Sequence, residues 1–138
     1  MSASFLPHLE RAAADGGRVE GRGNIINNTS ISALYVSRDS QIHLYTATKA
    51  AAESLSQNLA SKFTTLGVRV NSIAVGNIPS EINDISNPNS FIAKLKDIIP
   101  IGRVGNEEDI AGAVLYLASR AGSFVSGAML KVRFPNGK

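Results

Sequence analysis

Two residues of this chain are spaced so that one can help the other to move a proton. Tyr45 and Lys49 lie four residues apart in a segment that predicts a helix, where residues four apart project from the same face, one turn above the other. A free phenol has a pKa of about 10 and is a poor acid or base near neutrality, whereas a fixed cation nearby favours its ionised form. The pair therefore indicates general acid or base chemistry.

The spacing alone is not diagnostic, because tyrosine and lysine also occur four apart in many solvated helices. The flanking segments add to it. Residues 23–30 predict a short buried strand that ends in hydroxyl side chains, and residues 67–76 predict a second strand that ends at a glycine turn. A strand, a helix and a second strand form a right-handed crossover unit, so the Tyr45 helix is expected to lie on a parallel sheet.

Apolar periodicity and chain breakers predict the remaining elements. They are, in chain order, a helix over 5–14, a polar loop over 15–22, the helix over 45–63, a loop over 79–89, a short helix over 90–99 before Pro100, a helix capped by Asn106, and a third strand over 128–132. The expected core faces are Ala51, Leu55, Leu59 and Phe63 on the helix over 45–63, and Ile110, Val114 and Leu117 on the helix after Asn106.

Five motifs occur in the order typical of the short-chain dehydrogenase/reductase family, which this chain resembles over nearly its whole length. They are the strand that ends at Ser30, the Tyr45 to Lys49 segment, residues 68–73 (Val-Arg-Val-Asn-Ser-Ile), residues 102–111 and residues 122–127. The resemblance implies an α/β fold that forms the C-terminal half of a Rossmann-type doubly wound parallel sheet. About three parallel strands with flanking helices are expected, with residues 1–138 as a single partial domain.

The glycine-rich turn that opens a complete family domain has no counterpart in this chain. Such a turn lets the backbone approach the cofactor pyrophosphate at a helix N-terminus. The glycines at 16, 17, 21 and 23 lie in a polar stretch with no apolar strand before it, so a loop is expected there. The expectation is therefore a truncated family member that lacks the N-terminal dinucleotide-binding half.

Catalytic roles follow from the resemblance. Tyr45 matches the family's proton donor, and Lys49 matches the residue that lowers the phenol pKa and binds the nicotinamide ribose. Ser30 matches the serine that polarises the substrate carbonyl, although a serine at this place is also typical of a cap or turn. Ser32 is the reserve candidate, because the segment between Ser30 and Tyr45 is slightly longer than usual in the family.

The resemblance also implies cofactor contacts and a lid. Ile78 and Ser80 match an aliphatic position and a hydroxyl that contact the nicotinamide end of the cofactor, which is expected to be NADP, with NAD possible. Residues 80–100 match a substrate lid, where Phe91 and Leu95 are expected either to cover a pocket or to serve a core.

Two departures from the family pattern stand near these positions. Val75 replaces a proline, and residues 132–135 read Val-Arg-Phe-Pro where Val-Asp-Gly-Gly is common. The second departure leaves the contacts of the last loop unpredicted. Tyr35 and His43, on either side of the segment before the helix, are further candidates for a substrate pocket, although loop residues of these types are usually without function.

Composition narrows the class of protein. The chain has 138 residues, of which 43% are hydrophobic and 18% charged, which is ordinary for one globular core. It has no cysteine and two histidines far apart, so neither a disulfide framework nor a metal site is expected. The net charge of +3 is scattered, which argues against nucleic-acid binding. No apolar run is long enough for a membrane span, and the cytoplasm is the expected location.

Two functions are compatible with the sequence. In the first, the chain is an NAD(P)-dependent oxidoreductase that reduces a carbonyl or oxidises an alcohol of a small molecule, with Ser30, Tyr45 and Lys49 as its catalytic group. In the second, it is an inactive family fragment that acts only through association with another chain. A homo-oligomer or a complex with a complementary chain is expected, because the first surviving strand would expose an edge.

Overall fold

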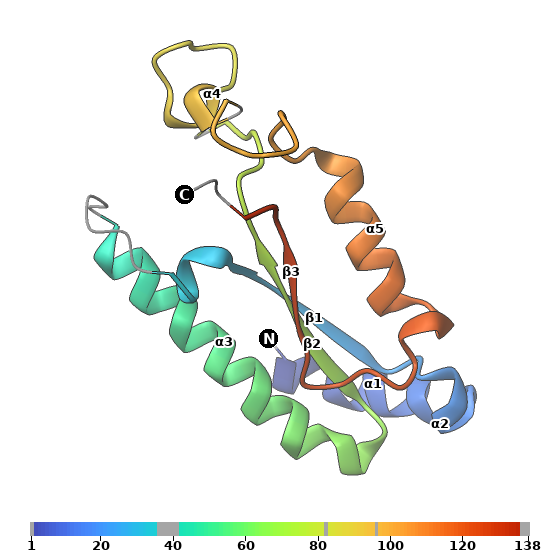
Figure 1. Ribbon diagram of the computed structural model, residues 1–138. Coiled ribbons are helices and arrows are strands. Elements are labelled where there is room, and N and C mark those ends of the chain that lie inside the picture. Colours follow the sequence, from blue (N-terminus) through green and yellow to red (C-terminus); the bar gives the residue numbers. More distant parts are fainter. Residues whose placement is uncertain (1, 36–41, 82, 96, 136–138) are drawn as a thin grey trace.

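The residues that the structure describes form one three-stranded parallel sheet with helices on both faces. The computed structural model describes residues 2–35, 42–81, 83–95 and 97–135. The strands β1 (Asn24–Ser30), β2 (Arg69–Val75) and β3 (Met129–Val132) are hydrogen-bonded in the order β1-β2-β3. In Figure 1, α3 (His43–Phe63) and α5 (Glu107–Ala118) run on opposite sides of the sheet. The predicted architecture of three parallel strands with flanking helices is confirmed.

Side chains of β2 alternate between the two faces, as a strand requires. Val70 joins a cluster on the α3 side, whereas Ile73 packs with Ala113 and Leu117 of α5. The same alternation places polar side chains at fixed positions on each face. The core is therefore split into two apolar layers, one on each side of the sheet.

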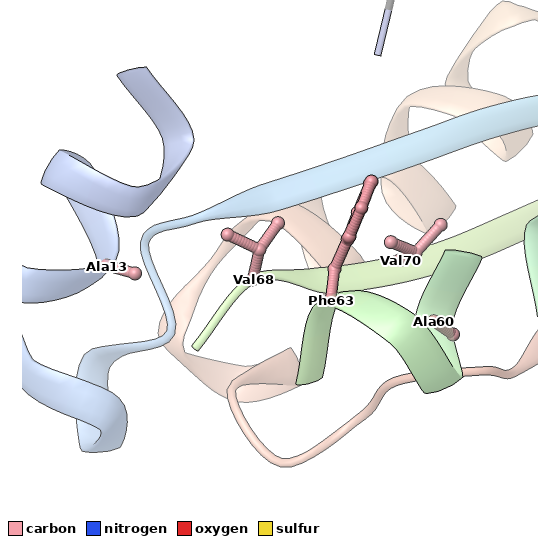
Figure 2. Packing of buried hydrophobic residues seen from close by; sticks show 5 residues of the cluster. All are labelled: Ala13, Ala60, Phe63, Val68 and Val70. Carbon is pink, nitrogen blue, oxygen red and sulfur yellow. The ribbon is translucent and has the colours of Figure 1, made fainter. Parts of the chain in front are cut away.

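The layer on the α3 side closes the amino ends of the strands. Figure 2 shows Phe63 at the end of α3 close to Val68, which precedes β2, and to Val70. Ala13 of α1 (Ser2–Asp15) completes this cluster together with Ala60. Val68 and Val70 have no exposed surface, so the helix end and the strand start are held by close packing.

The predicted core faces of the two long helices were partly wrong. On α3, Leu55 is 57% exposed, and the buried positions are Glu53, Ser56, Ala60 and Phe63. Steps of four residues turn a helix by about 400°, so a face chosen at that spacing drifts by about 40° per step. On α5 the buried residues are Ala113 and Leu117, whereas Val114 is exposed.

Short helical turns occupy several connections. They are α2 (Gly17–Glu20), α4 (Phe91–Leu95) and the 3₁₀ turns η1 (Ile31–Ala33), η2 (Thr64–Leu66) and η3 (Arg120–Gly122). The loop expected over 15–22 thus contains one turn of helix, which ends at Gly21 with a φ of 60°, a left-handed conformation that glycine adopts without strain. The helix expected over 90–99 is shorter than predicted.

The segment expected to form a lid has a small apolar cluster of its own. Its members are Ile92, Leu95, Ile99 and Val104, and they are separate from the two layers beside the sheet. Phe91 is 69% exposed, so only Leu95 of the two predicted lid residues serves this cluster. Residues 82 and 96 of the expected lid lie outside the described residues.

Within the part of the chain that the structure describes, no helix is long and apolar enough to cross a membrane.

Candidate active site

The candidate catalytic side chains lie at the carboxyl edge of the sheet. Ser30, the last residue of β1, is paired in register with Val75 at the end of β2, and Val75 with Val132 at the end of β3. The connection from β1 leads through η1 to α3, so the first turns of α3 start beside this edge (Figure 1). Open α/β sheets bind ligands outside the carboxyl ends of their strands.

Lys49 connects the helix to the sheet edge. Its Nζ donates a hydrogen bond of 3.3 Å to the main-chain oxygen of Asn28 in β1 and lies 5.6 Å from the centre of the Tyr45 ring. An ammonium at this distance from an aromatic ring makes a favourable cation–π contact. Tyr45 itself is 46% exposed, so a ligand can reach its phenol. The predicted pair is thus close in space and open to solvent.

Ser30 is buried and serves as a cap. Its Oγ accepts a hydrogen bond of 3.2 Å from the Ser32 amide, which starts the 3₁₀ turn η1. The capping role that the sequence left open is therefore present. The hydroxyl proton is not used in this contact, so a catalytic role for Ser30 or Ser32 stays a prediction.

Glu53 was missed as a site residue by sequence reasoning. It follows Lys49 by one helix turn, and its Oε2 accepts hydrogen bonds from Ser72 Oγ at 2.6 Å and from Thr29 Oγ1 at 3.2 Å. Its Oε1 is buried and has no hydrogen-bond partner among the described residues. One carboxyl group thus links α3 to both β1, next to Ser30, and β2. The signal was available, since Tyr45, Lys49 and Glu53 recur at four-residue spacing.

A second buried polar group fixes the opposite face of β2. Arg69 donates from Nε and Nη2 to the Gly21 oxygen and from Nη1 to the Gly122 oxygen, at 2.8 to 3.0 Å. Burial lowers the pKa of the Arg69 guanidinium. Asn71 donates to the Val125 oxygen at 2.8 Å and accepts from the amide that precedes β3 at 3.0 Å. These contacts hold the chain that leads into β3.

The two predicted cofactor residues after β2 have different surroundings. Ile78 packs against Gly105, where a β-carbon would collide with the Ile78 side chain, and the Gly105 amide donates to the Asn77 oxygen at 3.0 Å. Ile78 lines a cavity of about 140 Å³ that Arg103 and Arg133 also line. Ser80 is exposed and its backbone exchanges hydrogen bonds with Asn83. Ile78 therefore lines a cavity, whereas Ser80 lies on an exposed connection.

Arg103, on the wall of this cavity, is paired with a carboxylate. Its Nη1 and Nη2 lie 2.6 and 3.0 Å from the two oxygens of Asp109. The hydrogen bond from Arg103, followed by one from the Asn106 amide, lowers the pKa of Asp109 to about 2. Asn106 also caps α5 as predicted, because its side chain accepts from the Asp109 amide. The positive charge of Arg103 is thus neutralised within the fold.

Comparison with known proteins agrees with this arrangement. A family model described as enoyl-(acyl carrier protein) reductase matches residues 2–133, nearly the whole chain. The chain belongs to the short-chain dehydrogenase/reductase family. The family resemblance of the five sequence motifs is therefore confirmed.

Individual relatives within the family have diverse names. Galactitol 2-dehydrogenase (L-tagatose-forming) of Cereibacter sphaeroides is 40% identical over 114 residues, which is 81% of this chain and 44% of that protein. A crystal structure of gluconate 5-dehydrogenase from Burkholderia cenocepacia J2315 with NADP and tartrate matches with a TM-score of 0.78 and 27% identity, over 94% of this chain and 48% of that one. A 7α-hydroxysteroid dehydrogenase complexed with NADH and 7-oxo glycochenodeoxycholic acid matches with a TM-score of 0.80 and 31% identity, over 99% and 49% of the two chains. This member of the family thus spans about half the length of the relatives it matches.

The donors present at the sheet edge fit the ribose of a nicotinamide cofactor. The Lys49 ammonium has three protons, and one of them is used in the hydrogen bond to Asn28. The remaining donors are on a half-buried side chain beside Tyr45, where the family's cofactor is expected. The described residues contain no group of three or more metal-ligating side chains.

Proposed function

We propose that this chain is an NAD(P)-dependent oxidoreductase that interconverts a carbonyl and an alcohol of a small molecule. The observation that carries the proposal is the position of Lys49, which is bound to the Asn28 oxygen and lies over the Tyr45 ring at the carboxyl edge of the sheet. A cation held near an exposed phenol favours the phenolate that remains after the proton has been given away. The dehydrogenase and reductase names of its family relatives support the same activity.

In this proposal the protein residues manage a proton and a developing charge. Tyr45 gives its phenolic proton to the carbonyl oxygen during reduction and takes it back during oxidation. Lys49 stabilises the phenolate that remains, and Ser30 donates a hydrogen bond to the same substrate oxygen. The bound nicotinamide supplies the hydride. The roles of Lys49, Ile78 and Ser80 are then to hold the cofactor beside Tyr45.

NADP is the cofactor we propose, with NAD as the second choice. The related gluconate 5-dehydrogenase was crystallised with NADP and the 7α-hydroxysteroid dehydrogenase with NADH, so both occur among relatives of this chain. Contacts remote from the reacting carbon supply much of the binding that positions a cofactor. Because the chain contains no glycine-rich pyrophosphate turn, we expect it to bind NADPH with millimolar affinity at best.

Reduction of an activated ketone by NADPH tests the proposal. Tyr45→Phe should abolish turnover and leave cofactor affinity unchanged, because it removes the proton donor alone. Lys49→Ala should lower turnover, shift its pH profile and weaken NADPH binding. Tyr116→Phe, which changes a tyrosine of similar exposure on α5, is the matched control. Equal turnover in the Tyr45 and Tyr116 variants would refute a catalytic role for Tyr45.

A second function is favoured by the free edge of the sheet. Among the described strands β1 pairs only with β2, so its other edge is open to a further strand. We propose that, if catalysis is absent, the chain acts by association with itself or with a complementary chain. Light scattering at micromolar concentration tests this, and a stable, monodisperse monomer would contradict it.

We propose that residues 1–138 act as one partial Rossmann-type domain and that residues 80–100 serve as a substrate lid. The separate apolar cluster around Ile92 and Leu95 supports the lid, since a segment with its own small core can move as a unit. The proposed location is the cytoplasm.

A further inference from the structure

Arg133 and Tyr35 meet at the carboxyl edge of the sheet, although 98 positions separate them in the chain. The guanidinium carbon of Arg133 lies 4.7 Å from the centre of the Tyr35 ring. Tyr35 follows η1, which begins directly after Ser30, and Arg133 follows the last residue of β3. Both residues belong to segments whose function the sequence left open.

The backbone holds Arg133 against the end of β2. The Gly76 amide donates to the Val132 oxygen at 3.1 Å, and a β-carbon at Gly76 would lie 2.8 Å from the Arg133 β-carbon. Only glycine at position 76 therefore allows this approach. Arg133 Nε is used in a hydrogen bond of 3.0 Å to the Phe134 oxygen. These contacts, with the Tyr35 ring, restrict the orientation of the guanidinium.

The two terminal nitrogens of Arg133 are left for a ligand. Among the described residues, Arg133 makes no ion pair, and its side chain makes one hydrogen bond, through Nε. The other arginine of the cavity, Arg103, is neutralised by Asp109. The cavity of about 140 Å³ therefore contains one uncompensated positive charge. This volume is below the 300–1,000 Å³ typical of complete small-molecule sites, so it suits one part of a ligand.

The distance to the catalytic candidates suits a small substrate. Ser30, Val75 and Val132 are aligned on adjacent strands, which lie about 4.8 Å apart, so the Ser30 and Val132 backbones are roughly 10 Å apart. An extended chain of six carbons is roughly 6 Å long, and hydrogen bonds of about 3 Å at its two ends extend its reach to this gap. A substrate whose carbonyl reaches Ser30 and Tyr45 can therefore bring its other end to Arg133.

We propose that Arg133, oriented by Tyr35, is an anion subsite that binds the carboxylate of the substrate and selects a hydroxy or oxo acid over a neutral polyol. Arginine stacked on an aromatic ring keeps its N–H fork free in the plane, and this fork matches a carboxylate in two parallel hydrogen bonds. The proposal rests on the proposed oxidoreductase function, for which it names a substrate class.

Equilibrium binding to the full chain tests the subsite without turnover. The two probes are D-gluconate and D-glucitol, which differ in a carboxylate against a hydroxymethyl group, and binding is followed by NMR titration of the labelled protein. We expect weak, saturable gluconate binding with shifts at Arg133 and Tyr35, and at least tenfold weaker binding in Arg133→Gln. Arg133→Lys should lose part of the affinity, because it keeps the charge and loses the fork. Glucitol should bind to the wild type no more tightly than gluconate binds to Arg133→Gln.

Three results would overturn the proposal. The first is the absence of saturable gluconate binding, and the second is equal affinity of the wild type and Arg133→Gln. The third is a loss of NADP⁺ affinity in Arg133→Gln with gluconate binding unchanged, which would assign the guanidinium to a cofactor phosphate. Arg120→Gln, at an exposed arginine elsewhere, is the control. Failure of Tyr45→Phe to affect turnover would refute the catalytic proposal and leave this binding result intact.

Discussion

The buried and the exposed polar side chains of this fold use their hydrogen-bonding groups to very different extents. Arg69 is only 6% exposed and donates to main-chain oxygens from three of its nitrogens, whereas the partly exposed Lys49 has one such contact. The groups that hold the sheet, the helices and the connections together are therefore largely satisfied within the protein. The groups at the carboxyl edge keep donors free, which is what binding a ligand requires.

The largest effect on stability is expected from Arg69→Met. The variant leaves the Gly21 and Gly122 oxygens without their donors in a buried place, so the free energy of unfolding should fall by at least about 3 kcal/mol. Urea denaturation followed by circular dichroism measures this value. Arg120→Met, at an exposed arginine, should change it by less than about 0.5 kcal/mol. Equal unfolding curves for the two variants would show that the Arg69 contacts do not stabilise the fold.

Glu53→Gln should have the next largest effect. The amide keeps one acceptor for Ser72 and Thr29 but introduces an N–H₂ group where the buried Oε1 has no described partner. The expected loss is about 1–3 kcal/mol in the free energy of unfolding, by the same measurement. Glu81→Gln changes an exposed glutamate and is the control. An unchanged stability would indicate that the carboxyl group is bound no better than an amide.

Tyr45→Phe and Lys49→Ala should leave stability almost unchanged. Tyr45 is nearly half exposed, and Lys49 makes one hydrogen bond and one ring contact on the surface, so each variant should shift the free energy of unfolding by at most about 0.5–1 kcal/mol. The same variants should strongly reduce turnover. A loss of stability as large as that of Glu53→Gln would place this pair among the structural residues.

The smallest effect is a pH dependence that involves Asp109. Because Arg103 lowers the pKa of Asp109 from 3.8 to about 2, the pair stabilises the fold above pH of about 4 and loses this contribution as the pH falls through about 2. The free energies of unfolding of the wild type and Asp109→Asn should therefore differ at pH 5. They should converge near pH 2, because a protonated Asp109 no longer makes the contribution that the variant lacks at every pH. Asp97→Asn, at an exposed position, is the control for the removal of one carboxylate.

Local patterns predicted the elements but not every buried face. Strand ends, the Asn106 cap and the parallel order follow from short-range rules, because turn residues and crossover handedness restrict the choices. The buried face of α3 did not follow from apolar spacing. Its middle meets polar side chains of the sheet, where Glu53 accepts from the Ser72 hydroxyl and Ser56 from the Asn27 amide, so both are buried while Leu55 is exposed. Hydrophobicity alone cannot identify a polar interface of this kind.

Contacts between distant parts of the chain were also outside the reach of sequence patterns. Tyr45 and Lys49 were identified because one helix turn joins them. Arg133 and Tyr35 meet because the sheet aligns the ends of β1 and β3 through β2, and that depends on strand order and register. The departure from the family pattern at residues 132–135 was visible in the sequence. The contact of Arg133 with the Tyr35 ring was visible only in the structure.

The four-residue spacing along α3 fixes the number of residues that the helix can have between Tyr45 and Glu53. Tyr45, Lys49 and Glu53 are separated by about 6 Å and about 40° per step, so the exposed fraction falls from 46% at Tyr45 to 6% at Glu53 as the helix turns toward the sheet. One inserted residue between Lys49 and Glu53 would rotate the preceding turns by about 100° and carry the pair away from β1. Substitutions in this stretch alter single contacts, but an insertion or deletion would separate the chemistry from its support. Insertions in an exposed connection, such as residues 83–89, would leave this spacing unchanged.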